Sequence, residues 1–525
     1  MSKNIVIAKT NELQNGEMKT VKIDNDEEIL LTRINDQFYA TEAYCPHYGA
    51  PLETGTLIDK KIICPWHHAK FNIQNGELIN PPALDGIASF EIKVEGDDVI
   101  LISQNQSKNK DSKKSRKDET FLIIGGGAAG NAAAVKLREL GFDGHLIIVT
   151  ADSELPYDRT SLSKDFLKGD MDPEWLPLKP SDYYKKNNIE IILEQKVKNV
   201  DAEKRIVELK NKTRLEYDKL LVASGSEPNT FHSDQIESKN IYTLRTQHDA
   251  EQILNASKNA KDIVIIGASF IGMEVAENLN KDNRKINVIA PETVPFQNTF
   301  GEDVGQFIKD KNEKNGLTFY SGQQVKEFEG NGSIDKVILS SGETIKTDLV
   351  IVGVGVHPVT NFMPHFNKAT DGGLITDEYL QVENDVFAAG DIAKFPYSNN
   401  DKLIRVEHWR VAQQLGMIAA YNMLDFKKKI NIIPFFWTNM AGFHIRYVGH
   451  SENWDETVMK GDLNKGNILV LYIKDKEIEA VLGINKDKHM SIIEELFRLD
   501  KIPVSLANLE EKEITPNFLS ELLQS

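Results

Sequence analysis

The spacing of apolar residues changes character along the chain. Residues 3–103 contain short segments in which apolar and polar positions alternate and β-branched residues are frequent. That texture predicts an all-β unit. From Phe121 onward, apolar runs alternate with helical patterns, first as FLIIGG, AAGNAAAVKLREL and HLIIVT, and again from Asp262. Such alternation is typical of parallel, doubly wound α/β domains.

A further change occurs around Ile430, where aromatic and strand-like segments are followed by helix signals. We therefore expect a multidomain fold: an N-terminal all-β domain, two doubly wound, Rossmann-like α/β domains and a C-terminal α+β domain. The predicted limits are 1–103 for the first domain, 120–243 with 371–428 for the second, 244–370 for the third and 429–525 for the last.

Residues 104–119 lie between the first two domains, are rich in Lys and Ser and have almost no apolar side chains. Because such a segment cannot bury surface, we predict a solvated, flexible linker, with a basic docking site as the alternative. A flexible linker of this length would let the domains it joins sit on the order of 20 Å apart.

Composition narrows the setting. The 525-residue chain has a formal net charge of -17, which argues against nucleic acid or an anionic membrane surface as a partner. Two cysteines are too few for a disulfide framework, so we expect a reducing, cytoplasmic location. The N-terminus has no apolar stretch typical of a signal peptide, and we expect no membrane span.

Both cysteines are paired with a histidine at short spacing. Cys45 and His47 form C-x-H, and Cys64 and His67 form C-x-x-H. Two thiolates and two imidazoles can hold a two-iron cluster, with Cys on one iron and His on the other. A structural zinc site is the rival interpretation, and buried cysteines with incidental histidines are the third. His68 is a weaker ligand candidate because it breaks the C-x-x-H spacing.

The two loops, CPHYGAPL and CPWHHAKF, resemble those of Rieske ferredoxins. High-potential Rieske proteins carry an extra cysteine pair and a hydroxyl residue near the second loop. This chain has no third cysteine, and Ala69 occupies the position expected for the hydroxyl. Since hydrogen bonds to the cluster tune its potential, the resemblance implies a reduction potential near the low end of the Rieske range, about -150 mV.

The first α/β unit contains a dinucleotide fingerprint. Gly125, Gly127 and Gly130 form GxGxxG between an apolar strand and a helix, where the glycines allow a tight turn and close approach of a pyrophosphate to the helix N-terminus. Asp152 follows at the spacing expected for a ribose-binding acid, although a surface loop aspartate is the alternative.

Three other segments, LPYDRTSLSK, LLVASGSEPN and VFAAGDIA, resemble motifs of the FAD-dependent pyridine-nucleotide reductases. The resemblance implies that Lys164 lies near the isoalloxazine ring, Arg159 on the phosphates and Asp391 on the ribitol. A cation at the ring would stabilise negative charge on the reduced flavin. For Lys164 an exposed loop cation remains the alternative.

The second α/β unit carries a variant fingerprint, with Gly267, Ser269, Gly272 and Glu274 in GxSxxGxE. The small serine still permits close approach, so we expect a nicotinamide dinucleotide here; an empty βαβ unit is the alternative. In the family the glutamate lies near the nicotinamide and flavin rings. Ala290 stands where an acid binds the adenine ribose, and no arginine follows, which favours NADH over NADPH only modestly.

Taken together, these motifs resemble the apoptosis-inducing-factor-like, Rieske-containing oxidoreductases and the ferredoxin reductases that serve oxygenases. PFFWT adds Trp437, which resembles an aromatic residue beside the flavin, though a core tryptophan is an equal alternative. No cysteine follows Phe121, which excludes thiol chemistry at the flavin. The resemblance completes the set of expected cofactor-binding residues with Ala128, Ala129, Val197, Ala223, Gly225 and Gly353.

We therefore expect an NAD(P)H-dependent flavoprotein with Lys164 and Glu274 as catalytic residues. Electrons would pass from NADH or NADPH through FAD to the chain's own [2Fe-2S] cluster and on to an unidentified acceptor. A redox-sensing protein and the reductase component of an oxygenase system are the alternatives. The sequence leaves monomer and homodimer open.

Overall fold

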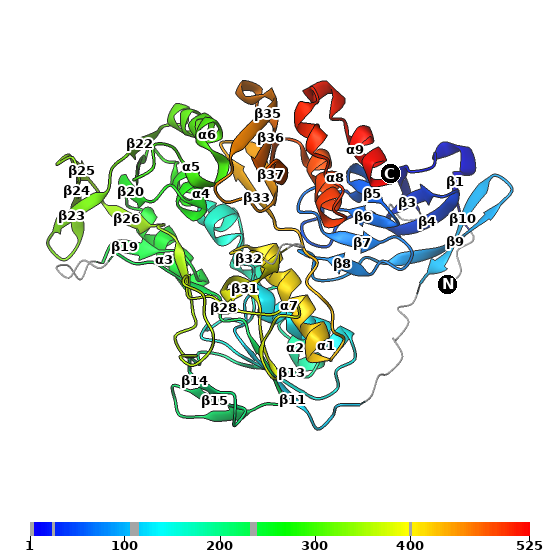
Figure 1. Ribbon diagram of the computed structural model, residues 1–525, viewed down its shortest axis with the longest axis horizontal. Helices are drawn as coiled ribbons and strands as arrows, with labels where there is room; N and C mark the ends of the chain where they lie inside the picture. Colours follow the sequence, from blue (N-terminus) through cyan, green and yellow to red (C-terminus); the bar gives the residue numbers. More distant parts are fainter. Residues whose placement is uncertain (1–4, 24–26, 106–114, 232–238, 398–401, 525) are drawn as a thin grey trace.

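The computed structural model describes residues 5–23, 27–105, 115–231, 239–397 and 402–524 (Figure 1). Residues 106–114 of the predicted linker lie outside the described residues. Its C-terminal end is described and held in place, because Arg116 forms ion pairs of 2.8 Å with Glu119 and 2.7 Å with Asp425.

The N-terminal unit is all-β, as the alternating sequence predicts. Its larger sheet has the order β1-β10-β9-β4-β3-β2, and a smaller sheet has the order β5-β6-β7-β8. The strands are β1 (Ile5–Lys9), β2 (Met18–Lys22), β3 (Glu28–Ile34), β4 (Gln37–Glu42), β5 (Thr56–Ile58), β6 (Lys61–Ile63), β7 (Lys70–Asn72), β8 (Leu78–Asn80), β9 (Ser89–Glu95) and β10 (Asp98–Gln104).

The first α/β unit is built on a sheet with the order β13-β12-β11-β17-β30-β29, parallel except for its edge strand β29. Its elements are β11 (Thr120–Ile124), α1 (Ala128–Glu139), β12 (His145–Val149), α2 (Tyr183–Lys186), β13 (Ile189–Ile192), β17 (Lys219–Val222), β29 (Gln381–Glu383), β30 (Val386–Ala388) and α7 (Trp409–Met423). Three small sheets extend it: β14 (Val197–Asp201), β15 (Ile206–Leu209) and β16 (Arg214–Glu216); β18 (Ser226–Pro228) with β27 (Val356–Pro358); and β28 (Leu374–Ile375), β31 (Ala393–Tyr397) and β32 (Lys402–Ile404).

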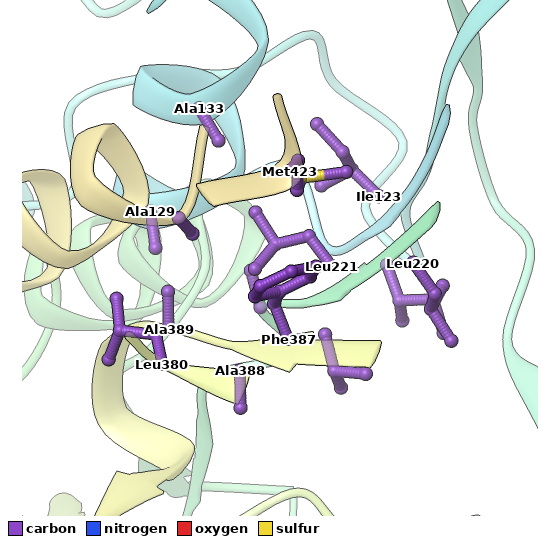
Figure 2. Close-up of a cluster of buried hydrophobic side chains, with 14 of the residues drawn as sticks. Ile123, Ala129, Ala133, Leu220, Leu221, Leu380, Phe387, Ala388, Ala389 and Met423 are labelled. Atoms are coloured by element: carbon purple, nitrogen blue, oxygen red, sulfur yellow. The ribbon is translucent and has the colours of Figure 1, made fainter. Parts of the chain in front are cut away.

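Helices α1 and α7 pack closely against each other above this sheet. A Cβ atom on Gly416 of α7 would lie 2.1 Å from the carbonyl oxygen of Ala129 in α1, so only glycine permits this crossing. Figure 2 shows Ala129, Ala133 and Met423 from these helices against Leu221 and Phe387 from the central strands. The apolar strands and alanine-rich helix of the sequence thus meet in one core.

The second α/β unit has the parallel order β19-β26-β20-β21-β22. Its elements are β19 (Ile241–Thr243), α3 (Gln247–Ser257), β20 (Asp262–Ile266), α4 (Phe270–Leu279), β21 (Lys285–Ala290), α5 (Gln297–Phe300), α6 (Glu302–Lys314), β22 (Leu317–Ser321) and β26 (Leu349–Val352), with a small sheet of β23 (Val325–Gly330), β24 (Ile334–Leu339) and β25 (Thr344–Lys346). Strand β19 belongs to this sheet although it lies just before the predicted limit at residue 244.

The C-terminal unit is α+β. Its antiparallel sheet has the order β33-β34-β37-β36-β35. Its elements are β33 (Phe435–Met440), β34 (Phe443–Gly449), β35 (Glu456–Asp462), β36 (Asn467–Lys474), β37 (Glu477–Ile484), α8 (Asp487–Arg498) and α9 (Pro516–Gln524). Figure 1 shows α8 and α9 beside the strands of the N-terminal unit. Across the described ranges, no helix has the length and apolar character needed to cross a membrane.

The N-terminal unit is joined to the rest of the molecule by a buried ion cluster. Glu494 of α8 lies 2.9 Å from both His68 Nδ1 and Lys70 Nζ and 2.7 Å from Arg410 of α7. Lys70 also pairs with Glu495. All these side chains are at most 2% exposed, so three parts of the chain are held together away from water.

Candidate cluster and flavin site

Two loops of similar build carry the Cys-His pairs. The first loop follows β4 and is closed by a 2.9 Å hydrogen bond from the Cys45 amide to the Ala50 carbonyl. The second joins β6 to β7 and is closed by a 2.8 Å bond from the Cys64 amide to the Ala69 carbonyl. Both cysteines are 1% exposed, within an apolar core that includes Phe71.

Like side chains of the two loops face each other. Cys45 and Cys64 are close enough for each thiol to shift the pKa of the other, and the Nδ1 atoms of His47 and His67 lie 3.2 Å apart. The donors therefore form a sulfur pair and a nitrogen pair, as a two-iron cluster with different ligands on each iron requires.

Protonation states at the site suit metal binding. Burial lowers the pKa of His47 to about 4, and burial followed by the charges of His47 and Arg446 places the pKa of His67 well below its usual value. Both imidazoles are thus neutral near pH 7, which is the ligating form. The hydrogen bond between the thiols raises the pKa of Cys45 and lowers that of Cys64, so Cys64 ionises first.

The histidine side of these loops faces the rest of the molecule. The ring of Trp437 lies 4.6 Å from that of His67, centroid to centroid. Tyr48, whose ring is 4.2 Å from His47, donates a 2.7 Å hydrogen bond to Asp158, and its hydroxyl oxygen lies 2.9 Å from that of Ser161. The first of the two loops thus touches the LPYDRTSLSK segment directly through Tyr48.

The first fingerprint has the strand–turn–helix form expected from sequence. Gly125 has φ +104°, and a Cβ there would lie 2.2 Å from the Ala223 carbonyl oxygen. A Cβ on Gly130 would lie 1.9 Å from the Gly125 carbonyl oxygen, whereas one on Gly127 would meet nothing within 4 Å. The open space at the start of α1 is a cradle in which a dinucleotide pyrophosphate fits.

Two of the predicted flavin residues are paired with each other. Asp152 and Arg159 form an ion pair in which each side chain is 19% exposed. Asp391 accepts a 2.6 Å hydrogen bond from Ser226 and forms a 3.1 Å ion pair with Arg245, a residue not singled out in the sequence. Asp152 follows β12 and Asp391 follows β30, so both acids lie at the edge where strands of the first α/β sheet end.

The predicted catalytic residues are in contact. Lys164 Nζ lies 2.8 Å from Glu274 Oε2, and the same oxygen accepts a 2.5 Å hydrogen bond from Ser163. The other oxygen of Glu274 accepts a 2.8 Å bond from Thr438. Lys164 and Ser163 belong to the first α/β unit, and Thr438 lies beside Trp437 on β33 of the C-terminal unit. Three units of the chain therefore meet at the Glu274 carboxylate of the second α/β unit.

The second fingerprint also has the expected form. Gly267 has φ +103°, and a Cβ there would lie 2.3 Å from the Gly353 carbonyl oxygen. A Cβ on Gly272 would lie 2.2 Å from the Gly267 carbonyl oxygen. Ser269, which replaces the middle glycine, caps α4 and donates a 2.7 Å hydrogen bond to the Gly353 carbonyl. The serine thus has a structural task that glycine cannot perform.

The other predicted cofactor residues occupy three kinds of position. Ala128 and Ala129 begin α1, Ala223 and Gly225 follow β17, and Val197 begins β14 and packs against the core of the first α/β unit. His408, which precedes α7, is not among the predicted site residues. Burial lowers its pKa to about 3, its Nδ1 has no hydrogen-bond partner in the part of the chain that the structure describes, and its ring lies 4.9 Å from Trp437. A buried nitrogen without a partner beside these motifs fits a polar cofactor group.

Comparison with known proteins agrees with these observations. Residues 3–91 match the model of the Rieske [2Fe-2S] domain, residues 119–416 that of the pyridine nucleotide-disulphide oxidoreductases, and residues 435–514 that of the reductase C-terminal domain. The matches imply a [2Fe-2S] cluster, FAD and NAD(P)H as cofactors, and the paired donors and glycine cradles fit them.

Individual relatives point the same way. The chain is 34% identical over 502 residues to apoptosis-inducing factor 3 of Homo sapiens, covering 92% of this chain and 82% of the relative. It is 31% identical to the 3-phenylpropionate/cinnamic acid dioxygenase ferredoxin–NAD(+) reductase component of Photorhabdus laumondii, over 72% of this chain and 96% of the relative.

A solved structure, the covalent putidaredoxin reductase–putidaredoxin complex, matches with a TM-score of 0.71 and 25% identity, over 76% of this chain and 98% of that chain. With three matching domain models and a relative that aligns with 92% of this chain, the chain belongs to the pyridine nucleotide-disulphide oxidoreductase family, as an apoptosis-inducing-factor-like flavoprotein with a Rieske domain at its N-terminal end.

Proposed function

We propose that this chain is an NAD(P)H-dependent oxidoreductase that takes electrons from NAD(P)H through FAD to its own Rieske cluster and then to a separate acceptor. When bound, FAD supplies the conversion of a two-electron hydride donor into single electrons that a [2Fe-2S] cluster can accept. The observation that carries the proposal is the contact between His67 and Trp437, next to Thr438 and the Glu274 carboxylate.

The chain's own residues have distinct tasks in this proposal. Gly127 and the start of α1 receive the FAD pyrophosphate, while Arg159 and Asp391 bind its phosphate and ribitol groups. Lys164 holds a positive charge at the isoalloxazine ring, and Glu274 fixes the position of that ammonium group. The dinucleotide of NAD(P)H binds at Gly267, Ser269 and Gly272.

The Rieske domain has a fixed place in this scheme. Tyr48 joins the first cluster loop to Asp158 and Ser161, and the Glu494 ion cluster holds the second loop. These contacts keep His67 against Trp437, so no diffusing carrier is needed. Pre-organised contact removes the entropic cost of bringing a separate carrier to the flavin.

The experiment is anaerobic stopped-flow mixing of the holoprotein with NADH, followed at flavin and cluster wavelengths. We expect flavin bleaching to precede cluster reduction within a single turnover. A protein whose flavin turns over repeatedly while its cluster stays oxidised would disprove the internal transfer.

The finer assignments are part of the same proposal. Low cysteine content favours a cytoplasmic location. The acceptor is a one-electron protein, since the ferredoxin–NAD(+) reductase component of a dioxygenase system is among the relatives. The oligomeric state is either monomer or homodimer.

A redox-sensing role is the second candidate function, favoured by the similarity to apoptosis-inducing factor 3. A large shape change on NADH binding without turnover would support it.

A further inference from the structure

A buried arginine of the C-terminal domain lies at the side of the cluster loops. Arg446 is on β34, directly opposite Trp437 on the neighbouring strand β33. Since directly opposed residues in an antiparallel pair point to the same face of the sheet, Arg446 and Trp437 both point toward the Rieske domain. Trp437 is in contact with His67 there.

The charge of Arg446 is held by few partners. Its side chain is 4% exposed, its Nη1 donates a 3.1 Å hydrogen bond to the Ile445 carbonyl, and its Nε lies 2.9 Å from Asp487 Oδ1. Neither atom has a hydrogen-bond partner among the described residues, so this contact is an ion pair without hydrogen-bond geometry. Asp487 is 29% exposed and sits in the first turn of α8, so its negative charge is partly screened by water and by the helix dipole.

Arg446 lies close to the cluster loops. It is paired across the strands with Trp437, and the ring of Trp437 is 4.6 Å from that of His67. Burial itself lowers the pKa of Arg446, but an arginine remains protonated near pH 7. A full positive charge in a buried environment acts over several ångströms because little water screens it.

We propose that Arg446 sets the reduction potential of the Rieske cluster by stabilising its reduced form. One-electron reduction adds one negative charge to the cluster, and a nearby buried cation lowers the free energy of the more negative state. The sequence has Ala69 where a hydroxyl would otherwise raise the potential. The reductase's C-terminal domain, packed against the Rieske domain, supplies a charge that offsets this loss.

The proposal rests on the proposed function for its place in the electron path, but its test does not. The experiment is an EPR-monitored redox titration of the full-length holoprotein, with dithionite and mediators, so that cluster reduction needs no electron from NADH. For Arg446→Met we expect the equilibrium constant for cluster reduction to fall by about tenfold, which is 59 mV for a one-electron couple. Arg446→Lys keeps the charge and is expected to stay close to wild type.

Two further variants serve as controls: one is expected to shift the cluster's reduction potential in the opposite direction, and the other is expected to leave it unchanged. Asp487→Asn removes the opposing negative charge and is expected to raise the cluster potential. Arg116→Met removes another arginine with an aspartate partner, outside the cluster loops and their contacts, and is expected to leave the potential unchanged. Iron content and the EPR line shape show that each variant holds an intact cluster.

The outcomes separate the two proposals. Equal potentials for wild type, Arg446→Met and Asp487→Asn would overturn the role of Arg446, as would an equal loss in Arg446→Lys and Arg446→Met. A cluster whose potential shifts as expected but that NADH does not reduce would support Arg446 and reject the internal electron path.

Discussion

At the scale of single residues, the Glu274 carboxylate has the most telling contacts. It accepts hydrogen bonds from Ser163 and Thr438 and pairs with Lys164. For Glu274→Gln we expect flavin reduction by NADH to slow by roughly 10-fold or more, because Lys164 loses the charge that positions it. Stopped-flow measurement of flavin absorbance gives this rate directly.

A neighbouring glutamate provides the matched control. Glu277 lies one turn further along α4 and accepts hydrogen bonds from the Ala441 amide rather than from Lys164. Burial raises its pKa, so an amide replaces it with a smaller change of charge. Glu277→Gln should reduce flavin at nearly the wild-type rate; equal slowing in both variants would mean that the helix, not the carboxylate, was disturbed.

The residues that sequence predicted best are those whose spacing is local. Two residues separate Cys64 from His67, and each fingerprint falls within a short stretch of the sequence, 125–130 and 267–272, so the pattern can be recognised locally. The contacts of Tyr48 and Arg446 could not be predicted, because their partners lie far away in the sequence. The Tyr48 hydroxyl, for example, bonds to Asp158, 110 residues away. A single sequence carries no signal for such a contact.

At the scale of elements, the turn between β11 and α1 contains two glycines, Gly127 and Gly130, for which we expect different effects of substitution by alanine. A methyl group on Gly130 would lie 1.9 Å from a carbonyl oxygen, whereas one on Gly127 meets only open space. Gly130→Ala is expected to cost about 1–3 kcal/mol by forcing α1 from the sheet, and to lower the melting temperature with and without FAD. Differential scanning calorimetry of the apoprotein measures it.

Gly127→Ala should behave differently. Because its backbone has φ -75°, alanine fits without strain, and the apoprotein should melt close to wild type. The added methyl group would instead occupy the cradle for the pyrophosphate, so the FAD dissociation constant should rise by tenfold or more, roughly 1.4 kcal/mol. Titration of the apoprotein with FAD tests this, and an unchanged affinity would place the pyrophosphate elsewhere.

The order of elements was largely predictable, since apolar runs and helical periods mark each βαβ unit. Their limits were less so: β19 joins the second sheet through pairing with β26, more than 100 residues later. The pairing of β18 with β27 likewise links segments assigned to different domains. Strand partners are chosen by tertiary packing, which periodicity does not contain.

At the scale of the whole molecule, the main difference from expectation concerns the Rieske domain. The polar segment after residue 103 predicts a tether that lets the domains it joins separate. The structure instead places His68, Lys70, Arg410 and Glu494 in one buried ion cluster. Its members come from residues more than 400 positions apart, so no local pattern announces it.

The buried ion cluster makes the docking of the Rieske domain on the rest of the molecule depend on pH. Burial alone would raise the pKa of Glu494, but the charges of Arg410 and Lys70 and the hydrogen bond with His68 hold it well below its usual value. The stabilisation is therefore present above the unfolded-state pKa of about 4.3 and is lost as pH falls through the lower folded pKa. We expect the circular dichroism of the [2Fe-2S] cluster to be lost in acid, below the folded-state pKa of Glu494, and to stay constant between pH 6 and pH 8.

Removal of the charge at neutral pH tests the same contact. Glu494→Gln removes the carboxylate that pairs with both Lys70 and Arg410, while Glu495 still pairs with Lys70, and breaking such a buried pair costs about 3–5 kcal/mol. We expect lower resistance to denaturant. We also expect slower reduction of the [2Fe-2S] cluster after a normal loss of flavin absorbance, because the Rieske domain no longer holds His67 on Trp437.

Asp85→Asn is the control variant. It breaks another contact between the Rieske domain and the first α/β unit, but Asp85 is 65% exposed and its pair with Lys179 is worth at most about 1 kcal/mol. If the two variants transferred electrons equally well, the buried cluster would stabilise the fold without positioning the Rieske domain for electron transfer.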